Sequence, residues 1–174
     1  MIIETTTDGS CSPNPGPGGW ACIFRAGGYA KAIYGYEPPI TTNIRMEMLA
    51  CIKALEHLKR PCQVNLYTDS QFVIDGITKW IYGWKKNGYQ TREKKEVANK
   101  ALWMQLDQAR NRHEVQWVHV KGHADHKDNL LCDELANKAR FTRSCGTTNL
   151  SAISKHLKPS DLTSERSITL NDEI

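Results

Sequence analysis

Cysteine pairs that could hold a metal ion are missing from this sequence. Its cysteines form no CxxC pair and no cluster with histidine at zinc-ligand spacing. The six cysteines are Cys11, Cys22, Cys51, Cys62, Cys132 and Cys145. The start of the chain also lacks the basic and apolar regions of a signal peptide, and thiols of a chain without an export signal are normally reduced. We therefore expect no disulfide, no zinc site and a cytoplasmic location.

Long apolar runs are missing as well, because no stretch approaches the roughly 20 residues that a membrane-spanning helix requires. The sequence thus predicts no contact with a membrane. With 174 residues, the chain can bury the core of one domain and is short for two. We expect a monomer built around a single globular domain.

Positive charge is concentrated in one segment. The net charge is only +4, yet seven basic residues stand against two acidic ones between Lys79 and Lys100. Trp80, Tyr82, Trp84 and Tyr89 alternate with these cations. A run of charge is usually a solvated helix face, but cations interleaved with aromatic rings are typical of surfaces that hold a nucleic-acid backbone. The segment therefore indicates nucleic-acid binding.

The expected elements change from strands to alternating helices and strands along the chain. The first forty residues contain β-branched runs and a turn rich in proline and glycine, whereas apolar residues recur at helical spacing from Thr42 onward. Thr41 or Thr42 can cap the first helix, and Ser70 can cap the second. The expected strands are Ile2–Cys11, Trp20–Arg25, Tyr29–Tyr36, Gln63–Thr68 and Glu114–Val120, and the expected helices are Thr42–Lys59, Ser70 through Ile81, Val97–Arg110 and Lys127–Arg140. This order predicts an α/β fold in which helices flank a mixed sheet.

The last part of the sequence differs from the rest. Residues 142–174 are rich in serine and threonine, poor in aromatic residues and balanced in charge, with no sustained period. We predict a domain over residues 1–141 and a flexible C-terminal tail over 142–174, which is available for a protein partner.

Four acidic residues lie at the ends of expected elements rather than along exposed helix faces. Asp8 is near the end of the first strand, Glu47 is in the first turns of the first helix, Asp69 follows the strand that ends at Thr68, and Asp133 is in the last helix. Taken singly, each has an ordinary structural explanation as a turn residue or a partner of the helix dipole. Strand ends on one edge of an open α/β sheet are, however, where such proteins bind ligands.

If these four carboxylates converge, they repel one another by about 4 kcal/mol per pair at 4 Å and intermediate dielectric. A cluster of this kind takes up protons or binds cations. All-oxygen ligands select hard divalent ions, so magnesium or manganese fits the site and zinc does not.

Five motifs in order resemble the successive signatures of type 1 ribonucleases H. They cover the chain from Ile2 to about Phe141 and are Thr7-Asp8-Gly9-Ser10, Thr41-Thr42-Asn43-Ile44-Arg45-Met46-Glu47, Tyr67-Thr68-Asp69-Ser70-Gln71, Val120-Lys121-Gly122-His123-Ala124 and Asn129-x-x-x-Asp133-x-x-Ala136. The resemblance implies a ribonuclease H-like fold with a five-stranded mixed sheet. It also implies an endonuclease that hydrolyses the RNA strand of RNA–DNA hybrids and leaves 3′-hydroxyl and 5′-phosphate ends.

By this resemblance, Asp8, Glu47, Asp69 and Asp133 hold two Mg²⁺ ions, for which Mn²⁺ is a possible substitute. Neighbouring helical residues point about 100° apart, so only one of Asp133 and Glu134 can face the site, and the motif assigns Asp133. His123 matches the mobile histidine of the family, which is thought to shuttle protons or to help the product leave.

The resemblance also indicates how the hybrid is held. Side chains of Asn14, Asn43 and Gln71 match positions that reach into its minor groove, Gly9 and Ser10 lie against the cut strand, and Thr42 contacts a DNA phosphate. The segment Trp80–Lys95 resembles the basic handle of bacterial members. The remaining expected hybrid contacts are Trp80, Trp84, Lys85, Lys86 and Asn129.

Two residues depart from the family pattern inside the motifs. Ile44 stands where relatives usually carry Asn or Gln, so a minor-groove hydrogen bond is in question, and Asp125 replaces a common Gly. Two other functions were weighed. A catalytically inactive hybrid-binding module would lack one of the acids, and none is missing. A different nuclease of the same fold, such as a Holliday-junction resolvase, would lack the Thr-Thr-Asn helix entry and the Lys-Gly-His loop.

Overall fold

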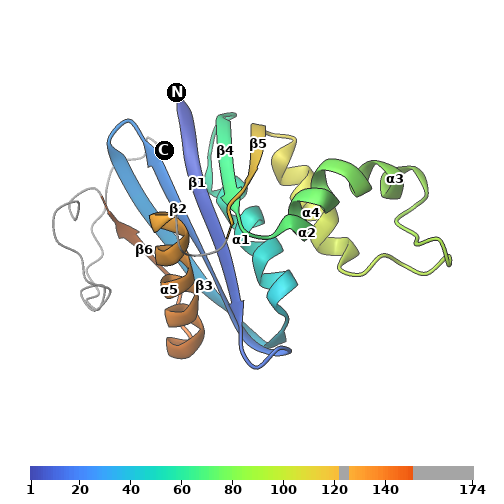
Figure 1. Ribbon diagram of the computed structural model, residues 1–174, viewed down its shortest axis with the longest axis horizontal. Helices are drawn as coiled ribbons and strands as arrows, with labels where there is room; N and C mark the ends of the chain where they lie inside the picture. Colours follow the sequence, from blue (N-terminus) through green and yellow to red (C-terminus); the bar gives the residue numbers. More distant parts are fainter. Residues whose placement is uncertain (122–125, 151–174) are drawn as a thin grey trace.

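The computed structural model describes residues 1–121 and 126–150. Its centre is a mixed sheet of six strands in the order β5-β4-β1-β2-β3-β6 (Figure 1). The strands are β1 (Ile2–Cys11), β2 (Gly16–Ala26), β3 (Tyr29–Thr41), β4 (Gln63–Thr68), β5 (Glu114–His119) and β6 (Gly146–Asn149). β1, β2 and β3 form an antiparallel meander, and β4 and β5 continue the sheet in parallel with β1.

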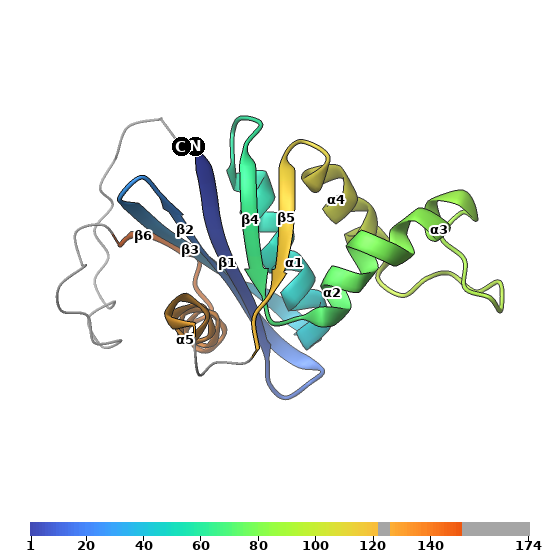
Figure 2. The same cartoon turned by 45° about the horizontal axis from the view of Figure 1, so that its top comes forward.

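Helices cover both faces of this sheet. They are α1 (Asn43–His57), α2 (Gln71–Asp75), α3 (Ile81–Lys86), α4 (Lys100–Arg110) and α5 (Lys127–Thr142), and a π-helical turn, η1 (Gly76–Trp80), joins α2 to α3. The α3 end of this segment and the loop after it project away from the sheet in both views (Figures 1 and 2). At the turn, the Arg110 guanidinium donates a hydrogen bond to the Ile77 carbonyl (2.8 Å), which fixes α4 against η1.

Two separate cores hold the layers together. On one face, α1 and α4 bury large apolar side chains such as Ile52, Leu55 and Leu106 against β1, β2 and β4. On the other face, α5 packs through Cys132, Leu135 and Ala136 onto small residues of β2 and β3. Two glycines allow these helices to approach closely. A Cβ on Gly9 would lie 2.4 Å from the Glu47 backbone nitrogen, and one on Gly19 would lie 2.1 Å from the Ala136 carbonyl oxygen.

The expected α/β fold with a mixed sheet flanked by helices is confirmed, and the predicted bounds of β1 and β4 agree with the structure. The helices begin and end within a few residues of their predicted positions. Thr42 is the cap of α1, since its hydroxyl accepts a hydrogen bond from the Arg45 N–H (3.3 Å). Ser70 is not a side-chain cap, contrary to the prediction.

The structure corrects the expected sheet and the expected start of the tail. A sixth strand, β6, pairs antiparallel with β3 in residues that were predicted to belong to the tail. Leu150, which follows it, is 6% exposed and belongs to the core beneath α5. The folded domain therefore extends to Leu150, and the rest of the predicted tail, residues 151–174, lies outside the described residues.

Two expectations about composition can be checked against the described residues. Among them, no helix combines the length and the apolar character needed to cross a bilayer. All six cysteines are free thiols, as expected, and four of them are fully or almost fully buried.

Candidate active site

Asp8 and Asp69 lie at the same end of two neighbouring strands. β1 and β4 are parallel, and their last paired residues are Thr6 and Tyr67. Each aspartate stands two residues beyond that pair, so the register brings Asp8 and Asp69 to adjacent positions at the carboxyl ends of their strands. This is the edge of an open α/β sheet where ligands are usually bound.

Glu47 reaches the same edge from α1. The first turn of α1 passes directly against Gly9, the neighbour of Asp8. The Ser70 hydroxyl, one residue after Asp69, donates a hydrogen bond to Glu47 Oε2 (2.6 Å). Ser70 thus orients Glu47 instead of capping α2, and it joins the helix-borne acid to the end of β4.

Asp133 reaches the edge from the opposite face. α5 is tied to β1 on both sides of Asp8. The Cys132 thiol donates to the Thr6 carbonyl (3.2 Å), and the Ser10 hydroxyl donates to Asn137 Oδ1 (2.7 Å). Asp133 is half-buried between these contacts, whereas Glu134 is exposed. Of the two neighbouring acids, Asp133 is the one that lies on the side of α5 held against β1.

Asp8 is the electrostatic centre of the four acids. Burial, and after it the negative charge of Asp69, raises the pKa of Asp8 to about 8, and Asp133 and Glu47 add to that rise while the Gly9 N–H opposes it. Burial also raises the pKa of Glu47, although the Ser70 hydrogen bond works against this. The strand register, the Ser70 contact and the contacts of α5 bring the four acids to the same edge of the sheet, where Asp69, Asp133 and Glu47 all disfavour the ionised form of Asp8.

The donor set suits a hard divalent cation. Asp8 Oδ1 accepts from the Gly9 N–H (2.8 Å), but Asp8 Oδ2 is buried and has no hydrogen-bond partner among residues 1–121 and 126–150. A buried carboxylate oxygen without a donor is costly unless a proton or a cation occupies it. Within the described part of the chain, no three acidic, cysteine or histidine side chains already surround one point as metal ligands do. Mg²⁺ needs no such cage, because one or two carboxylates usually hold it together with water and substrate phosphates.

Most of the polar side chains that were predicted to contact the hybrid surround this edge. Asn14 Oδ1 accepts from the Asn43 N–H (3.2 Å), which joins the β1–β2 loop to the start of α1. Thr42 caps α1, and Gln71 is exposed at the start of α2 with its amide on Asp75 (3.1 Å). Together with Gly9 and Ser10, these residues are called the polar rim here, and each is at least partly exposed.

Asn129 is not part of that rim. Its side chain is completely buried, and both of its polar atoms lack a hydrogen-bond partner within the described part of the chain. A side chain without exposed surface cannot touch a nucleic acid, so the predicted hybrid contact of Asn129 is wrong for this conformation. The motif that contains Asn129 gave no indication of its depth.

The predicted handle is built on an aromatic cluster. The rings of Phe72, Trp80, Trp84 and Trp103 pack in a chain with centroid distances of 5.2 to 5.9 Å. Trp80 is exposed over 39% of its surface, and Trp84 is half-buried. Lys85 donates to Asp107 Oδ2 (2.7 Å), and Arg110 holds the other carboxylate oxygen (2.9 Å). Lys85 therefore anchors α3 to α4, while Lys86 is exposed and has no ion-pair partner among the described residues.

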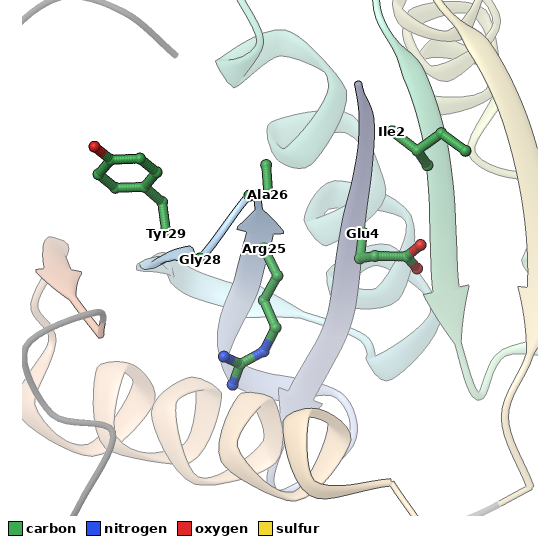
Figure 3. A pocket seen from close by; sticks show the side chains of 7 residues that line it. Ile2, Glu4, Arg25, Ala26, Gly28 and Tyr29 are labelled. Atoms are coloured by element: carbon green, nitrogen blue, oxygen red, sulfur yellow. The ribbon is translucent and has the colours of Figure 1, made fainter.

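His123, the predicted mobile histidine, and Asp125 lie outside the described residues. A separate shallow hollow of about 250 Å³ lies at the other end of the sheet, between the start of β1 and the β2–β3 turn (Figure 3). It is lined by Glu4, Arg25 and Tyr29 among others, and Arg25 is engaged by both oxygens of Asp128 (2.6 Å each). None of the four acids lines this hollow, so it is distinct from the candidate site.

Sequence reasoning missed two side chains that contact the acids. Ser70 was assigned only a capping role, and Asn137 was not singled out. Asn137 stands one helical turn after Asp133, and this i,i+4 spacing on a helix was the available signal.

Comparison with known proteins agrees with the geometry of this site. A sequence model of the RNase H family matches residues 3–141. The Ribonuclease H of Rhizobium meliloti is 57% identical over 136 residues, which cover 78% of this chain and 88% of the relative. That of Mesorhizobium japonicum is also 57% identical, covering 78% and 76% of the two chains. A solved type 1 RNase H with the type 2 active-site motif superposes with a TM-score of 0.77 at 26% identity, covering 92% of this chain and 83% of that one. This chain therefore belongs to the ribonuclease H family and is of the bacterial type.

Proposed function

We propose that this protein is an endonuclease that hydrolyses the RNA strand of RNA–DNA hybrids with two Mg²⁺ ions. The convergence of four carboxylates around the unpartnered, buried Oδ2 of Asp8 supports this proposal most strongly. Ribonuclease H relatives that are more than half identical to this chain support the same activity.

In this proposal Asp8, Glu47, Asp69 and Asp133 hold the ions. When bound, the ions supply the activation of the attacking water and the stabilisation of the leaving 3′ oxygen. The protein supplies fixed positions for the carboxylates, since Ser70 orients Glu47 and the Gly9 N–H orients Asp8. Mn²⁺ has the same preference for oxygen ligands and should substitute for Mg²⁺.

The polar rim is proposed to read the shape of the hybrid. Amides of Asn14, Asn43 and Gln71 would enter the minor groove, where RNA displays its 2′-hydroxyls, with Ser10 and the Gly9 backbone against the strand that is cut. Trp80, Trp84 and Lys86 on the handle would hold the other part of the duplex. By family resemblance, His123 would carry protons or help the product leave.

The ends of the products test the reaction type. Hydrolysis that expels the 3′ oxygen leaves a 3′-hydroxyl on one fragment and a 5′-phosphate on the next. We expect RNA fragments from a labelled hybrid in Mg²⁺ to be extended by a polymerase directly and to accept a 5′ label only after phosphatase treatment. Fragments that end in a 2′,3′-cyclic phosphate would contradict this mechanism, because the ribose 2′-hydroxyl would then be the nucleophile.

Ile44 is the clearest departure from the family pattern, and the structure explains it by packing. Its half-buried side chain lies against the core beneath α1 rather than in the polar rim. We expect Ile44→Asn to destabilise the protein by about 1–2 kcal/mol, because it places a polar group against apolar neighbours. Affinity for the hybrid, measured in Ca²⁺ to suppress turnover, should not improve.

Ile40→Asn is the matched control, since Ile40 is 71% exposed and its replacement should leave the thermal midpoint unchanged. If Ile44→Asn instead tightens hybrid binding severalfold without loss of stability, position 44 is a groove contact after all.

The handle cations differ in their availability to phosphate. Lys86, Arg92 and Lys94 have no acidic partner within 4 Å in the described chain, whereas Lys79, Lys95 and Lys100 are paired with Asp75, Glu93 and Glu96. Neutralising Lys86, Arg92 and Lys94 together should raise KM for the hybrid and leave kcat nearly unchanged. Each lost phosphate contact should flatten the slope of log K against log salt by about 0.9.

The matched control neutralises Lys79, Lys95 and Lys100, whose charges are already partly compensated, and it should change the salt slope less. If the variant without the charges of Lys86, Arg92 and Lys94 has the same salt slope as the parent, these cations form only a solvated face.

A further inference from the structure

The side-chain amide of Asn137, behind the candidate site, has a partner for each of its hydrogen-bonding groups. Asn137 Nδ2 donates to Asp133 Oδ1 (3.0 Å) and to the Asp133 carbonyl oxygen (2.9 Å). Asn137 Oδ1 accepts from the Ser10 hydroxyl (2.7 Å) and from Arg140 Nη2 (3.0 Å). An asparagine amide has two donor hydrogens and two acceptor lone pairs, and all four are engaged here.

The hydrogen-bond partners also fix the orientation of the Asn137 amide. Two oxygens of Asp133 lie on one side, and a guanidinium that can only donate lies on the other. Turning the amide by 180° would place its oxygen against the Asp133 carboxylate and its NH₂ against Arg140. Asn137 can therefore meet Asp133 only as a donor.

This amide links the helix-borne acid to the strand that carries Asp8. Ser10 belongs to β1, two residues after Asp8, and Arg140 Nη1 donates to the Ser12 carbonyl just beyond that strand (2.9 Å). A shift of α5 along the sheet, or a rotation of the Asp133 side chain, would break at least one of these hydrogen bonds. Among the described residues, Asn137 is the one hydrogen-bond donor to the Asp133 carboxylate, so the orientation of Asp133 depends on Asn137.

We infer that Asn137 is a positioning residue that holds the Asp133 carboxylate toward the metal site and couples its place to β1. This inference rests on the proposed function, in which Asp133 is a metal ligand. Groups that hydrogen-bond a ligating carboxylate from behind commonly change metal affinity by about 10- to 100-fold when they are removed. The geometry requires a donor at this place, so an apolar replacement should reduce Mg²⁺ affinity, while in the rim it directly affects only the hydroxyl of Ser10.

Asn137→Ala tests the inference, with Asn65→Ala as the matched control. Asn65 is also a half-buried asparagine whose Nδ2 donates to a carboxylate, Glu4 Oε1 (2.9 Å), but it lies on β4 away from the four acids. Mg²⁺ binding is followed without substrate through the backbone amide resonance of Gly9, which donates to Asp8. Thermal midpoints in EDTA, and kcat and KM for the hybrid at several Mg²⁺ concentrations, complete the measurement.

We expect the Mg²⁺ midpoint of Asn137→Ala to rise about tenfold, in the amide titration and in cleavage alike, with KM for the hybrid changed less than the Mg²⁺ midpoint. Asn65→Ala should lose thermal stability but keep the parent's Mg²⁺ midpoint. If the Mg²⁺ midpoint of Asn137→Ala equals the parent's while its thermal stability falls like that of Asn65→Ala, the role of Asn137 is structural only and the inference is wrong.

Two further outcomes remain decisive. Should Asn137→Ala fail to fold, Asn137→Gln keeps an amide but moves it by one methylene, and an unchanged Mg²⁺ midpoint in that variant would overturn the inference. If the parent and Asn65→Ala bind Mg²⁺ but do not cleave the hybrid, the proposed function fails, and the amide titration still decides the role of Asn137.

Discussion

Asp8→Asn and Asp69→Asn are each expected to reduce hybrid cleavage at least about a thousandfold while leaving the fold intact. Both residues stand at adjacent strand ends, and Asp8 Oδ2 has no protein partner that would survive as a substitute. An amide keeps the shape of the carboxylate but removes the negative charge that binds a divalent cation. The rate is measured under single-turnover conditions in saturating Mg²⁺, and the fold is checked by circular dichroism.

Glu134→Gln is the matched control for these two variants. It neutralises an exposed acid next to Asp133 without touching the site and should retain the parent's rate. Near-parent activity of either aspartate variant in Mg²⁺ would overturn the assignment of the site.

The metal-free protein should become more stable when Asp8 is neutralised, and this gain should grow with pH. The pKa of Asp8 is raised from 3.8 to about 8 in the folded protein, so the folded state holds a proton that the unfolded chain has already lost. Stability contributed by that proton is complete below about pH 4 and is lost as the pH rises toward 8. Asp8→Asn removes this loss, because its amide does not ionise.

In EDTA, the thermal midpoint of Asp8→Asn should therefore exceed the parent's by several degrees at pH 8, a shift that corresponds to about 2 kcal/mol for a domain of this size. The difference should shrink toward pH 4.5, and Mg²⁺ should stabilise the parent but not the variant. A difference that is the same at both pH values would show that burial and the neighbouring acids do not hold Asp8 protonated.

The expected elements with clear periodicity were predicted well, because local sequence determined them. β1 and β4 are β-branched runs, and the apolar spacing of α1 matches the residues that it buries. β3 was predicted to end at Tyr36 but continues past Pro38-Pro39 to Thr41. The prolines are tolerated because β6 pairs only with residues Lys31–Tyr34, so β3 is an edge strand beyond them and loses no sheet hydrogen bond on that side.

β6 could not be predicted from its own residues. Gly-Thr-Thr-Asn at 146–149 has no apolar alternation, and its glycine and asparagine disfavour a strand although its threonines favour one. Pairing with β3 supplies its hydrogen bonds. Leu150 then closes the core beneath α5. Such a strand depends on tertiary contacts, which override local preference.

The four acids of the site were found because their motifs are separated by characteristic elements. The side chains that support these acids were not predicted, because such contacts depend on which residues meet in the folded structure. Ser70 was predicted to cap a helix and contacts Glu47 instead. Asn129 was predicted to contact the hybrid and is buried, and Lys85, also a predicted hybrid contact, is paired with Asp107.

The most direct test of the account is cleavage of one sequence presented as four duplexes. A labelled RNA strand is paired with DNA or RNA, and a labelled DNA strand is paired with RNA or DNA, each with Mg²⁺ and again with excess EDTA. Because the site joins a carboxylate cluster to a rim suited to 2′-hydroxyls, the account predicts that only the RNA strand of the hybrid is cut and that EDTA abolishes this. Cleavage of duplex DNA at a comparable rate, or hybrid cleavage that persists in EDTA, would contradict it.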